Sequence, residues 1–335
     1  MTFYGRTLRG LEDLACKELS ERFGAHIHST GHREIFFSAD EPARLTDAGL
    51  LDDVFIFCGQ IDGIDHTRAS LQKLGEGAGE HLASLRRALA MRPGPARSLK
   101  VVASFLGRRN YNRYEIEAVV GAAVARKLGM TLFEGREEDA DRVLRVHLRD
   151  GAALLALRLF ERPLRQRPYK KVHYPGATPP QAGRALAMLA ELSPGARVLD
   201  PYCGTATVLI EAGLLQPSAR LHGGDVSTAS LIGGGINAAA AGVDISLYRM
   251  SALALAFADR SFDRIMANVP WGLQVDHAGQ ETLAWAELRR VLHPAGRAVV
   301  LVHEAHRSYP GFVPESDHQL RIYGQTSWIV TLRPA

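Results

Sequence analysis

Residues 196–207 read Ala-Arg-Val-Leu-Asp-Pro-Tyr-Cys-Gly-Thr-Ala-Thr, a stretch that predicts a buried strand, a tight turn and the start of a helix. A strand that ends in an acid, here Asp200, before a glycine-containing turn brings backbone N–H groups and a helix N-terminus close to a ligand. A second strand ends in an acid at Asp225, where a carboxylate can hold both hydroxyls of a ribose. Any doubly wound fold has acids at strand ends, so neither acid decides alone. Together they predict a nucleoside site.

The residues around this stretch alternate between helix-like and strand-like patterns. From about residue 181 the alternation is typical of a parallel sheet covered on both faces. We therefore expect an α/β fold with a Rossmann-like seven-stranded domain over residues 181–335. Its strands are expected at 196–200, 220–225, 245–249, 262–267, 297–303 and, for two more, near 318–333.

The first half mixes helices and strands in another order. Residues 1–60 predict strand, helix, strand, helix and strand, with the first helix beginning at Gly10. Residues 61–165 form a second expected domain, and residues 166–180 form a basic, proline-rich linker. The elements expected in the second domain are a helix near 77–91, a strand at 99–105, a helix at 114–128, and strands at 142–148 and 152–160 joined by a hairpin at Asp150-Gly151.

Composition limits the class of protein. With 335 residues, 46% apolar and 23% charged, the chain is long enough for two or three globular domains. No apolar run approaches the roughly 18 residues that a membrane span needs, and the N-terminus shows no secretion signal. The three cysteines, Cys16, Cys58 and Cys203, are too few for a disulfide framework. We expect a monomeric cytoplasmic protein with no membrane partner.

Basic residues are concentrated in the first half. Residues 176–335 contain 12 arginines, no lysine and 13 acids, a net charge of −1. The whole chain carries +4, so subtraction leaves +5 on residues 1–175. This asymmetry predicts that the first half contacts a polyanion, although a charge of this size is also common on ordinary surfaces.

The fourth strand of the C-terminal half ends in Asn268-Val269-Pro270-Trp271-Gly272. An exocyclic amine on a nucleobase is a poor nucleophile because its lone pair is delocalised into the ring. The side-chain oxygen of Asn268 and a nearby backbone carbonyl can bind the two amine hydrogens, while Pro270 fixes the turn and Trp271 stacks on the base. These three residues are the candidate catalytic group, acting by positioning and electrostatics. The alternative is a structural Asn-x-Pro turn, but its place after a strand of a nucleoside-binding sheet favours the functional interpretation.

Two kinds of nucleoside cofactor fit the paired acids. A dinucleotide needs the pattern Gly-x-Gly-x-x-Gly, so that its pyrophosphate sits at a helix N-terminus. The turn after Asp200 has one glycine, Gly204, and no second or third glycine in register, which argues against NAD or FAD. S-adenosylmethionine has no phosphate and tolerates Thr205 and Ala206 in the turn. The amine-binding motif therefore predicts S-adenosylmethionine as the cofactor.

These motifs resemble those of class I methyltransferases of the guanine-N2 type that carry an N-terminal THUMP domain, and the resemblance covers essentially the whole chain. Residues 200–207 are similar to the family's Asp-Pro-Phe/Tyr-Cys-Gly-Ser/Thr-Gly-Thr, and residues 268–272 to its Asp/Asn-x-Pro-aromatic-Gly. Residues 162–169 resemble its exit from THUMP, Pro-Leu-x-x-Arg-x-Tyr. The resemblance implies a ferredoxin-like domain over 1–60 and a THUMP RNA-binding domain over 61–165. It also implies formation of N2-methylguanosine in the acceptor-stem region of tRNA, with rRNA as an alternative.

The resemblance also assigns the cofactor site. Thr178 and Pro179 resemble the segment that folds back over the cofactor's methionine, and Ser251 stands where the family usually has an Asp that binds the adenine amine. The candidate cofactor residues are Thr178, Pro179, Asp200, Cys203, Gly204, Thr205, Ala206, Thr207, Asp225, Val226, Ser251, Ala252 and Asn268.

The chain departs from the family pattern at three places. Ala206 replaces the middle glycine of the first motif and is expected to put a methyl group near the cofactor. Ser251 replaces an acid, and Gly233-Gly234-Gly235 is poor helix material where a helix is expected. These departures keep open a non-catalytic RNA-binding protein with a degenerate methyltransferase domain.

Basic and aromatic residues interleave in two segments, 107–114 and 161–174. Phosphate neutralisation and ring stacking suit a single-stranded RNA end, although a solvated surface explains such clusters as well. The candidate RNA-binding residues are Arg108, Arg109, Tyr111, Arg113, Arg165, Arg167, Lys170 and Lys171.

No metal site is expected from the histidine clusters. No cysteine or acid completes the set of His26, His28 and His32. His303-Glu304-Ala305-His306 is one residue short of the zinc-protease motif and is expected at a strand end.

Overall fold

The structure is a computed structural model that describes residues 1–174, 176–270, 278–303 and 308–335. The chain divides into two compact units. Unit 1 comprises Met1–Arg6, Leu19–Asp47 and Asp52–Leu164, and unit 2 comprises Thr7–Glu18, Ala48–Leu51 and Arg165–Ala335. Each unit is described by itself.

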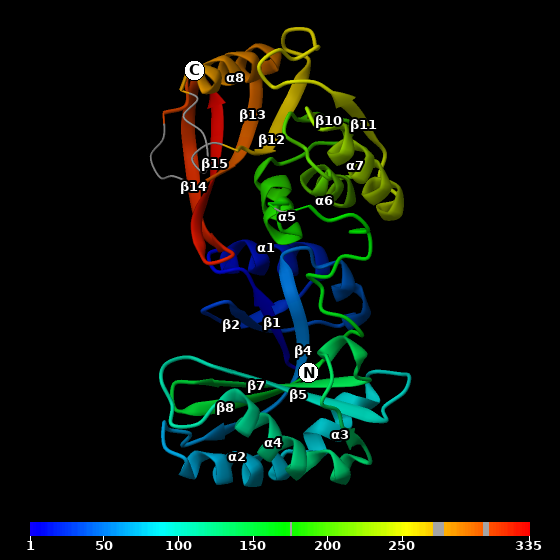
Figure 1. The fold of residues 1–335 in the computed structure, drawn as a ribbon, viewed down its shortest axis with the longest axis vertical. Helices are drawn as coiled ribbons and strands as arrows, with labels where there is room; N and C mark the ends of the chain where they lie inside the picture. Colours follow the sequence, from blue (N-terminus) through cyan, green and yellow to red (C-terminus); the bar gives the residue numbers. More distant parts are fainter. Residues whose placement is uncertain (175, 271–277, 304–307) are drawn as a thin grey trace. The chain divides into compact units, whose positions relative to one another are not determined.

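Unit 1 is built on an eight-stranded mixed sheet in the order β2-β3-β1-β4-β8-β7-β5-β6 (Figure 1). Its strands are β1 (Phe3–Thr7), β2 (His26–Gly31), β3 (Glu34–Ser38), β4 (Leu51–Asp62), β5 (Ser98–Phe105), β6 (Thr131–Leu132), β7 (Arg142–Arg149) and β8 (Ala152–Arg158). The helical elements before residue 165 are α1 (Glu12–Phe23), η1 (Pro42–Asp47), α2 (Ala69–Glu80), α3 (Leu82–Ala90), α4 (Arg113–Val124), η2 (Arg126–Leu128) and η3 (Glu137–Asp139). Helix α1 is divided between the two units at Glu18. Helices α2, α3 and α4 cover one face of the sheet (Figure 1).

Most elements expected in this half are confirmed. The hairpin between β7 and β8 turns at Asp150 (φ 46°) and Gly151 (φ 76°), the positive-φ pair that a tight hairpin needs. The single helix expected near 77–91 is wrong, because the residues form two helices that meet at His81 (φ −87°, ψ 10°). The second helix expected within residues 1–60 is the short 3₁₀ helix η1.

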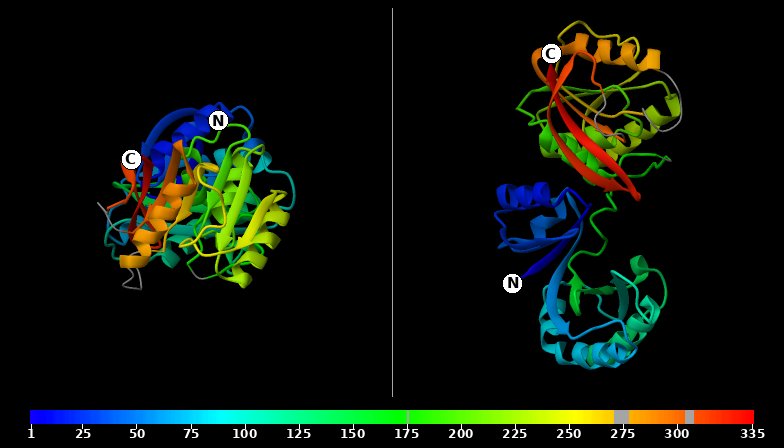
Figure 2. Two further views of the ribbon diagram at one scale, coloured as in Figure 1. Left: turned by 90° about the horizontal axis from the view of Figure 1, so that it is seen from above. Right: turned by 90° about the vertical axis from the view of Figure 1, so that its left-hand side faces the viewer.

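Unit 2 contains the seven strands expected after residue 181. Its sheet has the order β11-β10-β9-β12-β13-β15-β14, parallel from β11 to β13 and antiparallel in the last two strands (Figure 1). The strands are β9 (Arg197–Asp200), β10 (Arg220–Asp225), β11 (Ile245–Arg249), β12 (Phe262–Asn268), β13 (Leu292–Val302), β14 (Phe312–Ile322) and β15 (Gln325–Pro334). Strands β14 and β15 form the long hairpin drawn in red (Figure 2). The expected α/β class with mixed sheets is confirmed.

Four helices cover the two faces of this sheet. They are α5 (Pro180–Leu189), α6 (Thr207–Leu215), α7 (Thr228–Ala241) and α8 (Ala278–Val291). Side chains of α8 pack in one apolar cluster with Leu199 and Ile265. Arg264 points to the opposite face, where it donates to the Ala190 carbonyl at the end of α5 (2.6 Å). Because strand side chains alternate between faces, α8 and α5 cover opposite sides of the sheet.

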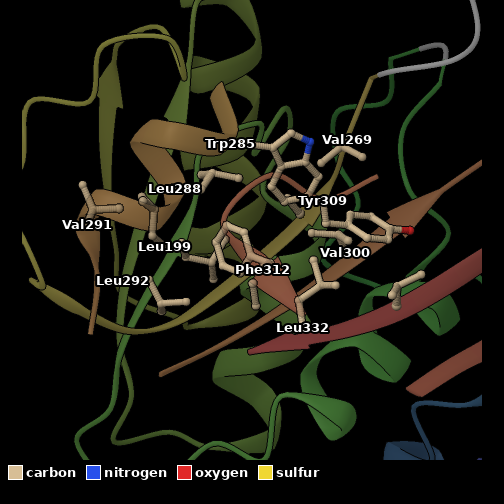
Figure 3. Close-up of a cluster of buried hydrophobic side chains, with 14 of the residues drawn as sticks. Leu199, Val269, Trp285, Leu288, Val291, Leu292, Val300, Tyr309, Phe312 and Leu332 are labelled. Atoms are coloured by element: carbon tan, nitrogen blue, oxygen red, sulfur yellow. The ribbon is translucent and has the colours of Figure 1, made fainter. Parts of the chain in front are cut away.

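The apolar cluster on the α8 side is the core that holds the strand ends in place (Figure 3). Trp285 is fully buried there and makes edge contacts with Tyr309 (ring centroids 5.4 Å apart) and Phe312 (5.5 Å). Val269, the residue after the last one of β12, belongs to the same cluster (Figure 3). The chain therefore leaves β12 anchored in the core.

A buried charge network holds the segment before α5. Glu211 of α6 accepts hydrogen bonds from Arg167 (2.9 Å) and the Tyr169 hydroxyl (2.9 Å), and it lies 3.3 Å from Nε of Arg184. Arg184 also pairs with Glu18 of α1 (3.4 Å). Burial opposes the charge on Arg167, but the ion pair with Glu211 outweighs burial and raises its pKa. The network ties the linker to α5, α6 and the first turns of α1.

Among the described residues, no helix is both long enough and apolar enough to cross a membrane.

Candidate functional site

The candidate site lies at the carboxyl edge of the parallel strands of unit 2. Strand β9 lies between β10 and β12 and is parallel to both. The ends of these three strands are Asp225 of β10, Asp200 of β9 and Asn268 of β12. The structure therefore brings the three strongest predictions from the sequence to one edge of one sheet, where open α/β sheets bind ligands.

Asp200 is a buried carboxyl. Its side chain accepts a hydrogen bond from the Tyr202 backbone N–H (3.0 Å). Burial, and to a smaller extent the charge of Asp225, raise the pKa of Asp200 to about 8, against the opposing effect of that hydrogen bond. At pH 7 the group is therefore mostly protonated and helps to shape the turn as a neutral acid.

Asp225 holds the glycine turn against the end of β10. One of its oxygens accepts from the Gly204 N–H (3.0 Å) and the other from the Ser227 N–H (2.8 Å). The Cys203 N–H also donates to the Gly224 carbonyl (2.9 Å). Asp225 remains half-buried, and each oxygen keeps a lone pair for a further donor such as a ribose hydroxyl.

The turn itself contains two left-handed residues, Gly204 (φ 51°) and Ala206 (φ 63°). The Ala206 side chain is fully buried in a cluster with Tyr169, Ile210 and Ala238. Its methyl group therefore packs into the protein core. The expectation that it lies near the cofactor stays a prediction. The departure costs about 1 kcal/mol of backbone strain, the usual price of the left-handed region for alanine.

The glycines of α7 allow this helix to approach the turn closely. A Cβ on Gly234 would lie 3.4 Å from both the Ala206 Cβ and the Gly204 carbonyl oxygen. A Cβ on Gly233 would lie 2.9 Å from Val172 Cγ1, closer than real Cβ atoms approach their neighbours. Packing thus requires a glycine at 233, and α7 forms despite three residues that are poor helix material.

Asn237 of α7 is a site residue that the sequence analysis missed. It is fully buried, and its amide makes four hydrogen bonds. The oxygen accepts from the backbone N–H groups of Lys171 (2.8 Å) and Val172 (2.9 Å), and the nitrogen donates to the carbonyls of Val172 (3.1 Å) and Thr205 (3.3 Å). Asn237 therefore fastens the linker to the glycine turn. The only feature of the sequence that points to Asn237 is its polar side chain within an otherwise largely apolar helix.

Three hydroxyl and amide oxygens at this edge lack hydrogen-bond partners. They are Thr205 Oγ1, Thr207 Oγ1 and Asn268 Oδ1, all buried and without a partner among the described residues. A buried polar atom without a partner costs about 1–3 kcal/mol, so such atoms call for a ligand or water. The Val269 N–H bonds the Leu301 carbonyl (3.2 Å), and Pro270 is exposed. Trp271 and Gly272 lie outside the described residues.

The remaining candidate cofactor residues lie in other segments of unit 2. Thr178 and Pro179 are buried immediately before α5, which begins at Pro180. Ser251 accepts a hydrogen bond from the Leu253 N–H (3.2 Å) within a turn, and Ala252 is buried. Val226 is exposed (66%) directly after Asp225. The hydroxyl of Ser251 thus already supports its own turn.

The candidate RNA-binding residues differ in their exposure. Those with exposed side chains are Arg108, Arg113, Arg165 and Lys171. Tyr111 is buried (4%) and its hydroxyl donates to the Asp65 carbonyl (2.6 Å), which also accepts from Arg109 (2.7 Å).

Arg167 and Lys170 are held within unit 2. Arg167 is buried in the network around Glu211, and Lys170 is half-buried and lies 3.5 Å from the Thr178 carbonyl. Burial lowers the pKa of Lys170, an effect that the charge of Glu211 opposes. Because Tyr111 and Arg167 keep almost no exposed surface, they do not offer a face to RNA.

The histidines do not gather into a metal site within the described part of the chain. His26 and His28 place their Nδ1 atoms 3.3 Å apart at the surface, and no third ligating side chain joins them there. Glu304 and His306 lie outside the described residues.

The comparisons with known proteins point to one family. A family model described as "RMKL-like, methyltransferase domain" matches residues 167–313. The tRNA (guanine(6)-N2)-methyltransferase of Thermus thermophilus is 35% identical over 230 residues, which cover 66% of this chain and 68% of that protein. The chain belongs to this methyltransferase family. The family uses S-adenosylmethionine as its cofactor.

More distant relatives share a part of their length with the chain. The U6 snRNA (guanine-N(2))-methyltransferase THUMPD2 of Homo sapiens is 30% identical over 198 residues. The match covers 58% of this chain but only 38% of that protein, so the chain spans less than half of this relative. Among solved structures, TrmN from Thermus thermophilus superposes with a TM-score of 0.79 over 100% of this chain and 99% of that one, at 28% identity. The matched residues 167–313 contain every candidate cofactor residue.

Proposed function

We propose that this protein is an S-adenosylmethionine-dependent RNA methyltransferase that forms N2-methylguanosine, with tRNA as its substrate. The observation that carries the proposal is the side-chain oxygen of Asn268. It is buried at the carboxyl edge of β12 and has no hydrogen-bond partner among the described residues. An acceptor without a donor, placed beside a nucleoside-binding turn, suits the hydrogens of a base amine.

The residues at this edge fit the cofactor. The half-buried carboxylate of Asp225 suits two ribose hydroxyls, and the hydroxyls of Thr205 and Thr207 are buried without partners among the described residues. When bound, S-adenosylmethionine supplies a methyl group on a positively charged sulfur. Gly204 and Ala206 shape the turn, and the single glycine suits a cofactor that carries no phosphate.

Asn268 acts on the guanine amine by positioning it. Its oxygen accepts one amine hydrogen and draws the nitrogen from a planar toward a pyramidal shape, so that the lone pair is less delocalised into the ring. Val269 keeps this oxygen in place because its side chain is buried in the core and its N–H is bonded to β13. Catalysis then rests on a preorganised acceptor, and no strong general base is required.

The first half is proposed to carry the RNA. We assign residues 1–60 to a ferredoxin-like domain, 61–165 to a THUMP domain and 181–335 to a Rossmann-like domain. The exposed cations Arg108, Arg113, Arg165 and Lys171 are the proposed phosphate contacts. The cytoplasmic location and the monomeric state expected from the sequence stay predictions.

Substitution of Asn268 tests the proposal. With tRNA that lacks the modification and S-adenosylmethionine, the full chain should form N2-methylguanosine, measured by mass spectrometry of nucleosides. Asn268→Leu should lower kcat by roughly 10²–10³-fold, the usual effect of losing a preorganised hydrogen-bonding group in an active site. Asn268→Asp keeps the acceptor oxygen and should retain more activity than Asn268→Leu.

The same assay separates the alternatives. Labelling of rRNA in place of tRNA would assign the enzyme to rRNA. Absence of N2-methylguanosine in every RNA, together with no calorimetric binding of S-adenosylmethionine at millimolar concentration, would leave an RNA-binding protein with a degenerate methyltransferase domain.

A further inference from the structure

One face of the eight-stranded sheet in unit 1 carries an aromatic cluster bordered by arginines. Tyr4, Phe55, Leu154 and Ala156 form the buried part of this cluster. Arg145 of β7 stacks on Phe55, with its guanidinium carbon 5.8 Å from the ring centroid. Its neighbours on the strand, Leu144 and Val146, are completely buried on the other face, as alternation along a strand requires.

Two of the arginines on this face have carboxylate partners. Arg158, which also stacks on Phe55, pairs with Asp53 (2.8 Å) and Glu137 (3.2 Å). Arg149 pairs with Glu34. These ion pairs satisfy the usual requirement that a buried or half-buried charge has a counter-charge.

Arg145 and Arg6 are not directly paired in the described part of the chain, where neither forms an ion pair with a carboxylate within 4 Å. Asp53 and Glu137 act on Arg145 only from beyond this distance. Arg145 donates only to the Ser104 hydroxyl (3.0 Å), and its buried Nε has no hydrogen-bond partner in the described part of the chain. Arg6 donates to the Tyr4 hydroxyl (3.0 Å). Both residues keep part of their surface exposed.

The pKa values of two groups on this face, Arg145 and His147, are lowered. Burial and the neighbouring Arg6 lower the pKa of Arg145 to about 10, against the weaker opposing effects of Tyr4, Asp53 and Glu137. Burial together with Arg6 and Arg145 lowers the pKa of His147 to about 4, so its ring is neutral at pH 7. The neutral ring fits its contact with Ser104, whose hydroxyl lies 2.8 Å from Nδ1 of His147. The hydroxyl can accept from Arg145 and donate to this nitrogen.

We propose that Arg6 and Arg145 bind a backbone phosphate of the RNA substrate on this face of unit 1. Arginine suits phosphate because its planar fork can donate two parallel hydrogen bonds, and an anion here supplies the counter-charge that the described residues do not. The two arginines thus add a phosphate contact outside segments 107–114 and 161–174. The inference rests on the proposed function only for the identity of the ligand.

Arg145→Met tests the site, and Arg158→Met is its matched control on the same aromatic ring. Binding of unmodified tRNA to the full chain is measured as a function of salt concentration. Arg145→Met should reduce the slope of log K against log salt by about 0.7–0.9, which corresponds to one lost phosphate contact, and Arg145→Lys should restore most of it. Arg158→Met should leave the slope unchanged, because the Arg158 charge is already paired.

Urea unfolding of the free proteins supplies a second readout. Arg145→Met should unfold at the same or a higher urea concentration than the wild type, since an uncompensated buried charge is removed. Arg158→Met should unfold at a clearly lower concentration, because it removes a buried ion pair with Asp53. If Arg145→Met did not fold, Arg6→Gln, at the one half-buried position of β1, would provide the slope of log K against log salt.

An unchanged salt slope in both Arg145→Met and Arg6→Gln would overturn the proposal. Stabilisation of the wild type by millimolar inorganic phosphate, together with an unchanged slope for tRNA, would assign the site to free phosphate and overturn the RNA assignment. Binding is measured without methyl transfer, so an inactive enzyme that still shows the slope change would refute the proposed function and leave this inference standing.

Discussion

A buried carboxyl at the end of β9 gives the candidate site a pH dependence. The pKa of Asp200 is raised to about 8 by burial, whereas an aspartate in an unfolded chain titrates near 4. The folded state therefore holds the proton more tightly than the unfolded state. The contribution of Asp200 to the stability of the folded state is complete below about pH 4 and is lost progressively as the pH rises towards 8.

Asp200→Asn should remove this part of the pH dependence. The amide cannot ionise, so the variant should equal the wild type most closely near pH 4 and become the more stable of the two at pH 8. Urea unfolding at pH 4, 6 and 8 measures the difference, and other titrating groups cancel in the comparison. Parallel pH profiles of the two proteins would contradict the raised pKa.

At the scale of the element, helix α7 shows how packing overrides helix propensity. A Cβ on Gly233 would lie 2.9 Å from Val172 Cγ1, whereas a Cβ on Gly234 would make ordinary contacts at 3.4 Å and one on Gly235 would meet only Leu247 Cδ1 at 3.9 Å. The three glycines look alike in the sequence. Only their neighbours distinguish Gly233, which has no room for a side chain, from Gly235, which can be replaced.

Substitution of these glycines should have opposite effects. Gly235→Ala should stabilise the protein by about 0.5–1 kcal/mol, because alanine is the better helix former. Gly233→Ala should gain the same propensity but lose more than it gains, since its Cβ would lie 2.9 Å from Val172 Cγ1. Thermal or urea unfolding measures both variants. Equal stabilisation by the two would show that α7 does not need this close approach.

At the scale of the whole molecule, the buried network around Glu211 connects residues that are far apart in the chain. It joins Glu18, Arg167 and Arg184, and Tyr169 completes it. Loss of one partner leaves buried charges uncompensated, so such networks are sensitive to single substitutions even where their net contribution to stability is small.

Glu211→Gln should therefore destabilise the protein by about 3–5 kcal/mol, because Arg167 and Arg184 lose a buried counter-charge. Glu41→Gln is the control, since its pair with Arg44 is exposed on both sides and should contribute less than about 1 kcal/mol. Urea unfolding compares the two. A similar small effect for both would mean that water or another group satisfies the arginines.

The sequence alone predicted all seven strands of the second sheet, although β13 and β14 begin earlier than expected, and in the first sheet it missed the strands β2 and β6. Alternation and periodicity are local properties, so they can be read without a structure. The sequence also placed Asp200, Asp225 and Asn268 at strand ends, and topology then brought them to one edge because parallel strands share their carboxyl edge.

The tertiary structure alone decided which side chains are free to meet a ligand. Tyr111 and Arg167 are residue types common on RNA-binding surfaces. Packing nevertheless buries Tyr111 against Asp65 and Arg167 against Glu211. Ala206 carries a methyl group where the family has a glycine, and only the fold shows that this methyl group packs in the core. Burial and pairing depend on contacts between distant residues, and no local pattern records them, which is why Asn237 was missed and the unpaired charge of Arg145 could be seen only in the fold.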